Sequence, residues 1–361
     1  MKKEPITLLG VGDIIIDREK PETIFQYVGD VLRSGDITFA NCDQVYSDKG
    51  YLIHGHGTHS DPRNIPALIY AGLDVVSLAN NHMFDRGAEA LLDTMERFKA
   101  AGLPCVGAGK NLAEAHQPVI LERKGTKVGF LAYSSVHPQE SEAKKDSPGV
   151  CPIRVWTFYE SKPHQQPGGE PQIITVPYVE DLVAMLEDIR KLRSQVDVIV
   201  VSFHWGVHFV PRVIPLYCID IGHAAIDAGA DLILGTHTHI LKGIEVYKGK
   251  VIFYSTNNFA SEIGPGALKA SAGSSIPRTV LEWFKSQEVR KTLITRTIIE
   301  NGSINRVAYI PCYINDQLEP EIVTRNDTKG QEVYNYLKDI SRSQGLSVNF
   351  SWDSDEVLIT P

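Results

Sequence analysis

Apolar residues occur in short continuous runs along this chain, and polar side chains follow each run directly. The six runs cover residues 6–11, 37–40, 75–78, 198–203, 232–235 and 251–254. Runs of this kind, rich in Val, Ile and Leu, are typical of strands buried on both faces. The polar residues that follow them include Asp13, Asp43, Asn80, Asn81, His82, His204, His237, His239 and Asn257.

Segments with helical spacing of apolar residues lie between the runs, at 22–34, 87–101, 180–194 and 215–228. This alternation of strands and helices predicts an α/β layered fold. Ligands in such folds bind beyond the carboxyl ends of the strands, so the polar residues at those ends are expected in one cleft.

The stretch His237-Thr238-His239 carries the strongest chemical signal at these strand ends. In an extended segment alternate residues project the same way, so the two imidazoles can serve one metal ion or two adjacent ions. Alone, the pair is equally typical of a polar strand end with capping or solvated histidines. The recurrence of ligand-type residues at the other strand ends favours a metal site.

Composition narrows the class of protein. The chain has 361 residues, 43% of them hydrophobic, and a formal net charge of −8 without a basic run, which argues against nucleic acid as a partner. It shows no long apolar segment for a signal peptide or membrane span, so we expect a cytoplasmic protein. Five scattered cysteines without a C-x-x-C pair imply neither a disulfide framework nor a thiolate zinc site. A homo-oligomer stays open.

Two segments interrupt the rhythm of strands and helices. Residues 137–177 carry seven prolines and are expected to form a flap, and residues 260–277 are rich in small residues and are expected to form a lid loop. Strands are predicted at 292–300 and 307–310, and a helix at 330–344. We therefore expect one domain over 1–325, with the C-terminal helix and tail of 326–361 packed on it.

Six motifs in order resemble the CapA-type proteins, a family named for capsule and poly-γ-glutamate biosynthesis and related to the calcineurin-like metallophosphoesterases. The resemblance runs from about residue 6 to residue 259. The motifs are Gly12-Asp13, Asn41-Cys42-Asp43, Ala79-Asn80-Asn81-His82 with Asp85-Arg86-Gly87, His204-Trp205-Gly206, Gly235 to His239, and Tyr254 to Phe259. The resemblance implies a layered sandwich of mixed β-sheets flanked by helices.

The resemblance also implies a site for two divalent metal ions. Asp43 would bridge them, with one ion completed by Asn81, His204 and His237, and the other held by Asp13 and His239. Carboxylate, amide and imidazole ligands suit Mn, Fe or Zn. His82 would be left free to face the substrate as an acid or electrophilic donor, and Asp85 can orient it if the turn brings the two together. Without the family, Asp13 is interpreted as a strand-end turn residue, Asn81 and Asp43 as caps of a helix or turn, and His204 as a core histidine.

The chain departs from the family pattern at several positions. Ile15 stands where metallophosphoesterases have a histidine, and Asp43 where this family commonly has glutamate. His208 replaces the usual glutamate of His-Trp-Gly-x-Glu and is a candidate catalytic base, and Asn257 replaces a glycine. The changes lie beside the expected ligands or in the substrate pocket, so they leave the reaction open.

Other residues near the motifs are candidates for substrate binding. The cluster His54-Gly55-His56-Gly57-Thr58-His59 places three histidines between the second and third motifs, and its glycines let the backbone approach a ligand. A metal-ligand role that fills the place left by Ile15 and a flexible solvated loop are the alternatives. Arg63 and Arg86 are the cations nearest to the motifs and can pair with a carboxylate or phosphate, unless they are ordinary surface arginines. Asn257 completes the candidate substrate contacts.

The predicted function is that of a metal-dependent hydrolase with a binuclear site. It would cleave a phosphoester or an amide of a small acidic molecule or peptide through a metal-activated water. Two alternatives stay open: metal-dependent proton abstraction on a peptide, as in epimerisation, and a non-catalytic binding protein linked to polyglutamate or capsule synthesis.

Overall fold

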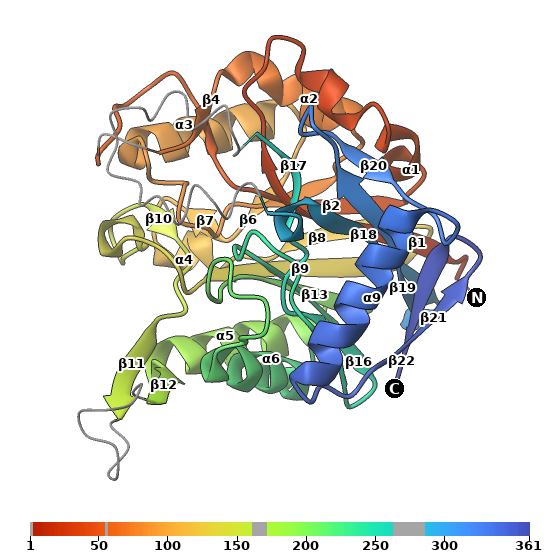
Figure 1. The fold of residues 1–361 in the computed structure, drawn as a ribbon. Coiled ribbons are helices and arrows are strands. Elements are labelled where there is room, and N and C mark those ends of the chain that lie inside the picture. Colours follow the sequence, from red (N-terminus) through yellow and green to blue (C-terminus); the bar gives the residue numbers. More distant parts are fainter. Residues whose placement is uncertain (1–2, 55–56, 161–171, 263–285) are drawn as a thin grey trace.

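The computed structural model describes residues 3–54, 57–160, 172–262 and 286–361, and two mixed β-sheets packed face to face form its centre (Figure 1). The larger sheet has ten strands. Its main order is β21 (Asn349–Asp353), β22 (Glu356–Thr360), β19 (Ser303–Ile314), β18 (Lys291–Glu300), β1 (Ile6–Ile15), β2 (Ile37–Cys42), β5 (Val75–Ser77) and β6 (Cys105–Val106). β17 (Asn258–Ser261) also pairs with β1, and β20 (Pro320–Ile322) with β19.

The smaller sheet has six strands, and side chains from both sheets meet between them. Its order is β15 (Ile244–Tyr247), β16 (Lys250–Phe253), β14 (Leu232–Thr236), β13 (Val198–His204), β9 (Thr126–Ser134) and β8 (Val119–Arg123). Phe39 of β2 and Phe130 of β9 stack across the interface with ring centroids 5.8 Å apart. All six predicted strands are therefore present, and both faces of each sheet are covered.

Helices cover the outer faces of the two sheets (Figure 1). The larger sheet is covered by α1 (Gly29–Arg33), α2 (Ile65–Tyr70) and α3 (Gly87–Ala100), and the smaller by α5 (Val179–Arg193) and α6 (Leu216–Ala228). The result is a layered sandwich of mixed sheets flanked by helices, so the predicted fold class is confirmed. The helices predicted at 87–101, 180–194 and 215–228 are confirmed to within two residues.

The continuous helix predicted at 22–34 is wrong. The chain instead forms a short 3-10 turn, η1 (Pro21–Phe25), and then α1. Val28 lies between them with φ −125° and ψ −14°, outside helical geometry, and its side chain is fully buried. Packing of this side chain on the sheet prevails over local helical spacing.

The C-terminal segment contributes a helix and two strands. The predicted helix is confirmed as α9 (Thr328–Ser343), whose Val333, Leu337 and Ile340 join the core between the sheets. After α9, where a tail is predicted, β21 and β22 form a hairpin that extends the larger sheet. Arg306 of β19 holds this hairpin by an ion pair with Glu356 at 2.7 Å.

The segment expected to form one flap divides into parts. Its first part contains the turn η3 (Gln139–Ser141), and β10 (Gly149–Val150) pairs with β7 (Ala108–Gly109). Its second part is a hairpin of β11 (Val155–Glu160) and β12 (Gln172–Pro177), which projects from the body beside α5 and α6 (Figure 1). Residues 161–171 lie outside the described residues, as do 263–277 of the expected lid loop; β17 ends at Ser261.

Short elements connect these layers. They are β3 (Val45–Tyr46), β4 (His59–Ser60), η2 (Pro62–Asn64), α4 (Leu112–Ala115) and η4 (Glu288–Arg290). Among the helices that the structure describes, none is both long and apolar enough to cross a bilayer.

Candidate metal centre

The carboxyl ends of β1, β2, β13 and β14 meet at one edge of the sandwich and carry the predicted ligands. Asp13 and Asn41 lie side by side in the parallel pair β1 and β2, and His204 is the last residue of β13. The two sheets are joined here, because Asp13 Oδ2 accepts a hydrogen bond from the backbone N–H of His237 at 3.2 Å. β1 continues to Ile15, so Asp13 lies within the strand and not after it.

The residues that the resemblance assigned to the first ion converge on His204 Nε2. This atom lies 2.7 Å from Asn81 Oδ1, 3.1 Å from His237 Nδ1 and 3.6 Å from Asp43 Oδ1. The opposite ring atom, His204 Nδ1, lies 2.9 Å from Thr236 Oγ1. An Nδ1–H that donates to Thr236 leaves the Nε2 lone pair facing the cluster, which is the tautomer that a metal requires.

A second group forms around His239. Its Nδ1 lies 2.8 Å from Asn258 Oδ1 and 4.0 Å from Asp13 Oδ2. Asp13 and His239 are the residues that the resemblance assigned to the second ion, and Asn258 adds an amide oxygen that the sequence analysis missed. The neighbouring asparagines 257 and 258 were both visible in the motif, but only the fold decides which of them faces the site.

The two histidines of the H-x-H pair adopt strained backbone conformations. β14 ends at Thr236, and the φ angles of His237 and His239 are 90° and 53°. The pair follows the strand and is not extended, so strand alternation does not place the two rings. Their centroids are nevertheless 6.2 Å apart, so the prediction that they serve one ion or two adjacent ions stays open. Non-glycine residues in this region cost of order 1–3 kcal/mol each and cluster at functional sites.

The charges in the cluster suit cations. Both carboxylate oxygens of Asp43 are buried without a hydrogen-bond partner, and burial raises the pKa of Asp43 to about 6. Burial and the charge of Asp43 also raise the pKa of Asp13. Burial, together with the neighbouring histidines, lowers the pKa of His204 and His237 and favours the neutral, metal-binding imidazole.

The donor set therefore fits two divalent ions. Two carboxylates, three neutral imidazoles and two amide oxygens are hard or borderline ligands of the kind that Mn, Fe and Zn accept. Among the described residues, no three His, Cys, Asp or Glu side chains are already arranged to hold an ion. The fit rests on the donor chemistry and on the unpartnered oxygens of Asp43.

His82 lies next to this cluster and is held by Asp85, as the sequence analysis anticipated. His82 Nδ1 is 2.7 Å from Asp85 Oδ2, and the same carboxylate oxygen accepts the backbone N–H of Thr58 at 2.6 Å. Burial lowers the pKa of His82, but the charge of Asp43 and the bond to Asp85 prevail and raise it to about 9. The imidazolium form is thereby favoured.

Two asparagines without a predicted role in the site hydrogen-bond to its ligands or to the loops that carry them. Asn41 Nδ2 donates to Asp13 Oδ1 at 2.8 Å. Asn80 Nδ2 donates to the Cys42 carbonyl at 2.7 Å, and its Oδ1 accepts the N–H of His82 at 3.1 Å. Both side chains are fully buried, so they fix the loops that carry the ligands.

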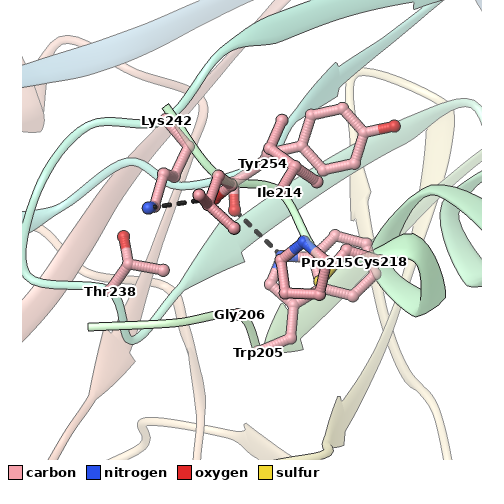
Figure 2. Close-up of a pocket in the computed structure, with 9 residues that line it drawn as sticks. Trp205, Gly206, Ile214, Pro215, Cys218, Thr238, Lys242 and Tyr254 are labelled. Carbon is pink, nitrogen blue, oxygen red and sulfur yellow. Dashed lines mark hydrogen bonds between the residues drawn. The ribbon is translucent and has the colours of Figure 1, made fainter. Parts of the chain in front are cut away.

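His208 packs against the H-x-H pair. Its ring centroid lies 3.9 Å from that of His237 and 5.0 Å from that of His239, while the residue keeps an exposed edge. The buried Lys242 fixes the loop that follows His208. Its ammonium group donates to the Val210 carbonyl and to the Val213 carbonyl, the latter at 3.1 Å. Figure 2 shows Lys242 and Trp205 among the side chains that line one pocket. The Trp205 indole N–H donates to the Tyr254 carbonyl at 2.9 Å.

The structure corrects the prediction that Asn257 contacts substrate. Its side chain is buried, and Nδ2 donates to the carbonyls of Val289 and Lys291 at 3.1 and 2.6 Å, away from the ligands. Its φ of 67° explains why asparagine stands at a position where glycine is usual, because asparagine tolerates the left-handed region better than most residues.

Arg86 is also corrected, because its guanidinium is engaged in the fold. Nε donates to the Lys49 carbonyl at 2.8 Å and Nη2 to the Gly50 carbonyl at 2.7 Å. It therefore holds the loop after β3 and not a substrate. Arg86→Met is expected to lower the free energy of unfolding by about 2 kcal/mol, measured by urea denaturation, because charged hydrogen bonds are lost.

The metal content of Arg86→Met is expected to equal that of the native chain. Arg63→Met is the control, because the Arg63 side chain is 71% exposed and its one ion pair within the described part of the chain is with Asp61 at 3.5 Å. Its stability should stay within about 0.5 kcal/mol of the native value. Equal stability of the two variants would contradict the structural role of Arg86.

The two histidines of the cluster that the structure describes, His54 and His59, are exposed. His54 Nε2 pairs with Glu140 Oε1 at 2.8 Å, and both side chains are about half exposed. His59 is exposed in β4, and His56 lies outside the described residues. The neighbouring Gly57 has φ 148° and lies so close to Asp85 that a Cβ would come within 2.5 Å of Oδ2. The loop therefore packs on the carboxylate that holds His82.

Comparison with known proteins identifies the family. The model of the family described as bacterial capsule synthesis protein PGA_cap matches residues 7–262. The chain belongs to this family. The resemblance inferred from the six motifs is thus confirmed, and the matched residues of this PGA_cap protein include every predicted metal ligand.

Relatives and solved structures extend the comparison. This PGA_cap chain is 29% identical over 284 residues to capsule biosynthesis protein CapA of Bacillus anthracis, with 75% of the chain covered. It is 30% identical over 266 residues to PGA biosynthesis protein CapA of Bacillus subtilis, with 70% covered. The chain spans 63% of the length of each of these relatives. The calcineurin-like phosphoesterase YfkN of Bacillus subtilis is similar in structure, with a TM-score of 0.45 at 14% identity over 96% of this chain and 100% of that one.

Proposed function

We propose that this PGA_cap protein is a metal-dependent hydrolase that cleaves a phosphoester or an amide of a small acidic molecule or peptide. One observation carries the proposal: the buried, unpartnered carboxylate of Asp43 faces the neutral imidazole of His204. His82, whose Nδ1 is held by Asp85, lies within reach of the Asp43 charge. The names of the two Bacillus relatives, which refer to capsule and PGA biosynthesis, support an acidic substrate.

The residues that would hold two divalent ions follow from the two groups in the site. Asp43, Asn81, His204 and His237 would hold one ion, and Asp13, His239 and Asn258 the other, with Asp43 between them. When bound, Mn, Fe or Zn supplies a nucleophile from water and stabilises developing negative charge. Thr236 holds the His204 ring and Asn41 holds the Asp13 carboxylate, so hydrogen bonds within the protein orient the donor atoms of both ligands.

His82 is the proposed general acid. Asp85 fixes its Nδ1 at 2.7 Å and favours the protonated ring, which leaves Nε2 for the substrate. A proton delivered from Nε2 neutralises the oxygen or nitrogen that leaves the cleaved bond. His208, which packs on the His237 ring and keeps an exposed edge, is the second residue proposed to contact the substrate.

Metal content and turnover together test the proposal. The full chain is expected to retain close to two equivalents of metal by elemental mass spectrometry, and to hydrolyse bis(p-nitrophenyl) phosphate or γ-glutamyl-p-nitroanilide. A chain with bound metal that cleaves neither probe nor a wider panel of phosphoesters and amides would contradict the hydrolase proposal. A chain that takes up no metal after reconstitution would contradict the metal site itself.

His82→Ala is expected to lower kcat about 100-fold while metal content is unchanged, because a general acid contributes roughly 10²–10⁴ in rate. His223→Ala is the control. His223 lies on α6, and its imidazole also pairs with a carboxylate, that of Glu245 at 3.0 Å. Its kcat should match the native value. If His82→Ala also lost metal, His82 would be a ligand and not the acid.

A further inference from the structure

His137 is a buried polar side chain that the proposed mechanism does not use. Its side chain is 3% exposed, and its Nδ1 has no hydrogen-bond partner. A buried imidazole nitrogen without a partner loses its contact with water and gains nothing in return, which typically costs about 1–3 kcal/mol. Such an atom needs an explanation in a native protein.

The fold places His137 at the edge of the metal centre. It follows β9 by three residues, and β9 pairs with β13 so that Ser134 lies directly beside His204. The connection continues beyond the strands, because the Ser135 N–H donates to the His204 carbonyl at 3.0 Å. Ser134 Oγ then donates to the Val136 carbonyl at 2.9 Å and fixes the path to His137.

The turn after His137 supplies a carboxylate that orients its ring. Pro138 begins the turn, and η3 returns the chain so that Glu142 Oε1 lies 3.4 Å from His137 Nε2. Glu142 is fixed in turn, since it pairs with Val150 in the backbone and lies 4.0 Å from the Arg154 guanidinium. The pair thus directs Nε2 to Glu142 and leaves Nδ1 on the other edge of the ring.

This arrangement repeats that of His82 and Asp85 with the two ring nitrogens exchanged. His82 comes from the larger sheet, after β5, whereas His137 comes from the smaller sheet, after β9. Positive charge on either ring lowers the pKa of His204, so both lie within electrostatic reach of the same ligand. Two carboxylate-held imidazoles therefore reach the centre from different sheets.

We propose that His137 is a substrate-contact residue whose Nδ1–H donates a hydrogen bond to an anionic oxygen of the molecule bound at the metal centre. The inference rests on the metal site of the proposed function. Glu142 faces Nε2, so Nδ1 is the ring nitrogen left for the bound molecule, and a proton on Nδ1 makes it a hydrogen-bond donor. An anionic oxygen, from a phosphate or a carboxylate group, is the acceptor that such a donor prefers.

Binding of inorganic phosphate to the full chain loaded with Mn²⁺ tests this contact without any need for turnover. The dissociation constant, measured by isothermal titration calorimetry, is expected to rise about tenfold or more in His137→Ala. His137→Gln keeps a donor of similar size and should lose less affinity than His137→Ala. Glu142→Gln should weaken phosphate binding as well, because the His137 ring loses the carboxylate that orients it. Manganese content is expected to stay at the native value in all three variants.

His116→Gln is the matched control, because it breaks another buried imidazole–carboxylate pair, with Asp188 at 2.5 Å, outside the centre. Its phosphate affinity should equal that of the native chain. Unchanged affinity in His137→Ala, or metal-loaded native protein that does not bind phosphate, would overturn the proposal. Loss of manganese in His137→Gln would overturn it too, by making His137 a ligand. Hydrolysis of the ester and amide probes is measured separately, so phosphate binding without hydrolysis would sink the proposed function and leave this contact standing.

Discussion

Asp43→Asn is expected to stabilise the metal-free protein and to remove the stabilisation that divalent metal gives the native chain. Both oxygens of the Asp43 carboxylate are buried without a partner, and an ionised group in that position is costly to fold around. Asparagine has the same shape without the charge, and its amide can donate to His204 Nε2, 3.6 Å from the present Oδ1. The free energy of unfolding without metal should rise by about 1–3 kcal/mol.

Metal reverses the order of stability. An ion that binds only the folded state adds about 2.7 kcal/mol to the native chain when its free concentration is 100 times its dissociation constant. The variant lacks the carboxylate proposed to lie between both ions, so it should gain little from Mn²⁺ and show no turnover. Urea denaturation of chelator-treated protein, with and without added Mn²⁺, measures both effects on the same samples.

Asp181→Asn is the control for this experiment. Asp181 is also buried, but its carboxylate accepts hydrogen bonds from the Arg154 guanidinium at 2.7 and 2.8 Å. Loss of that charge removes the closest ion pair of Arg154 and leaves it only the Glu142 carboxylate at 4.0 Å among the described acidic residues, so the control should be less stable than the native chain with or without metal. If Asp43→Asn behaved like Asp181→Asn in the absence of metal, the Asp43 carboxylate would have a protein partner and the metal interpretation would fail.

Much of the site was predictable because sheet topology gathers residues that sequence alone separates. Asp43 and His204 are 161 positions apart by their numbers, yet each lies at the carboxyl end of a strand at the same edge of the sandwich. An apolar run that ends in a ligand-type residue is enough to place it there. The prediction depended on strand ends and not on the direction of any side chain.

The direction of individual side chains could not be predicted from the sequence. Asn257 and Asn258 are adjacent and chemically identical, but the left-handed φ of Asn257 turns it toward β18 and leaves Asn258 to meet His239. Arg86 is close to the motifs in sequence, but its reach to the carbonyls after β3 depends on how the loops meet. His137 appeared only as the first residue of a proline-rich segment, and its burial beside β9 depends on long-range packing.

Gly12→Ala is expected to destabilise the protein by about 3–5 kcal/mol, among the largest effects of any single methyl group in this chain. A Cβ at position 12 would lie 1.7 Å from the Asn257 carbonyl oxygen, a distance that no rotamer change relieves. The same carbonyl accepts the N–H of Asp13 at 2.9 Å, so it cannot retreat without breaking the pairing of β1 and β17. We expect a lower urea midpoint and a loss of bound metal, because Asp13 and Asn258 would be displaced together.

Gly222→Ala is the comparison that separates this contact from a general intolerance of alanine. Gly222 lies in α6, where an added Cβ would be 3.5 Å from Ile252 and Trp205, an ordinary contact distance. Alanine is favoured over glycine in a helix by about 1 kcal/mol, so this variant should be as stable as the native chain or more so. Equal urea midpoints for Gly12→Ala and the native chain would mean that β1 and the Asn257 loop are not in contact. The joint support of Asp13 and Asn258 would then need another origin.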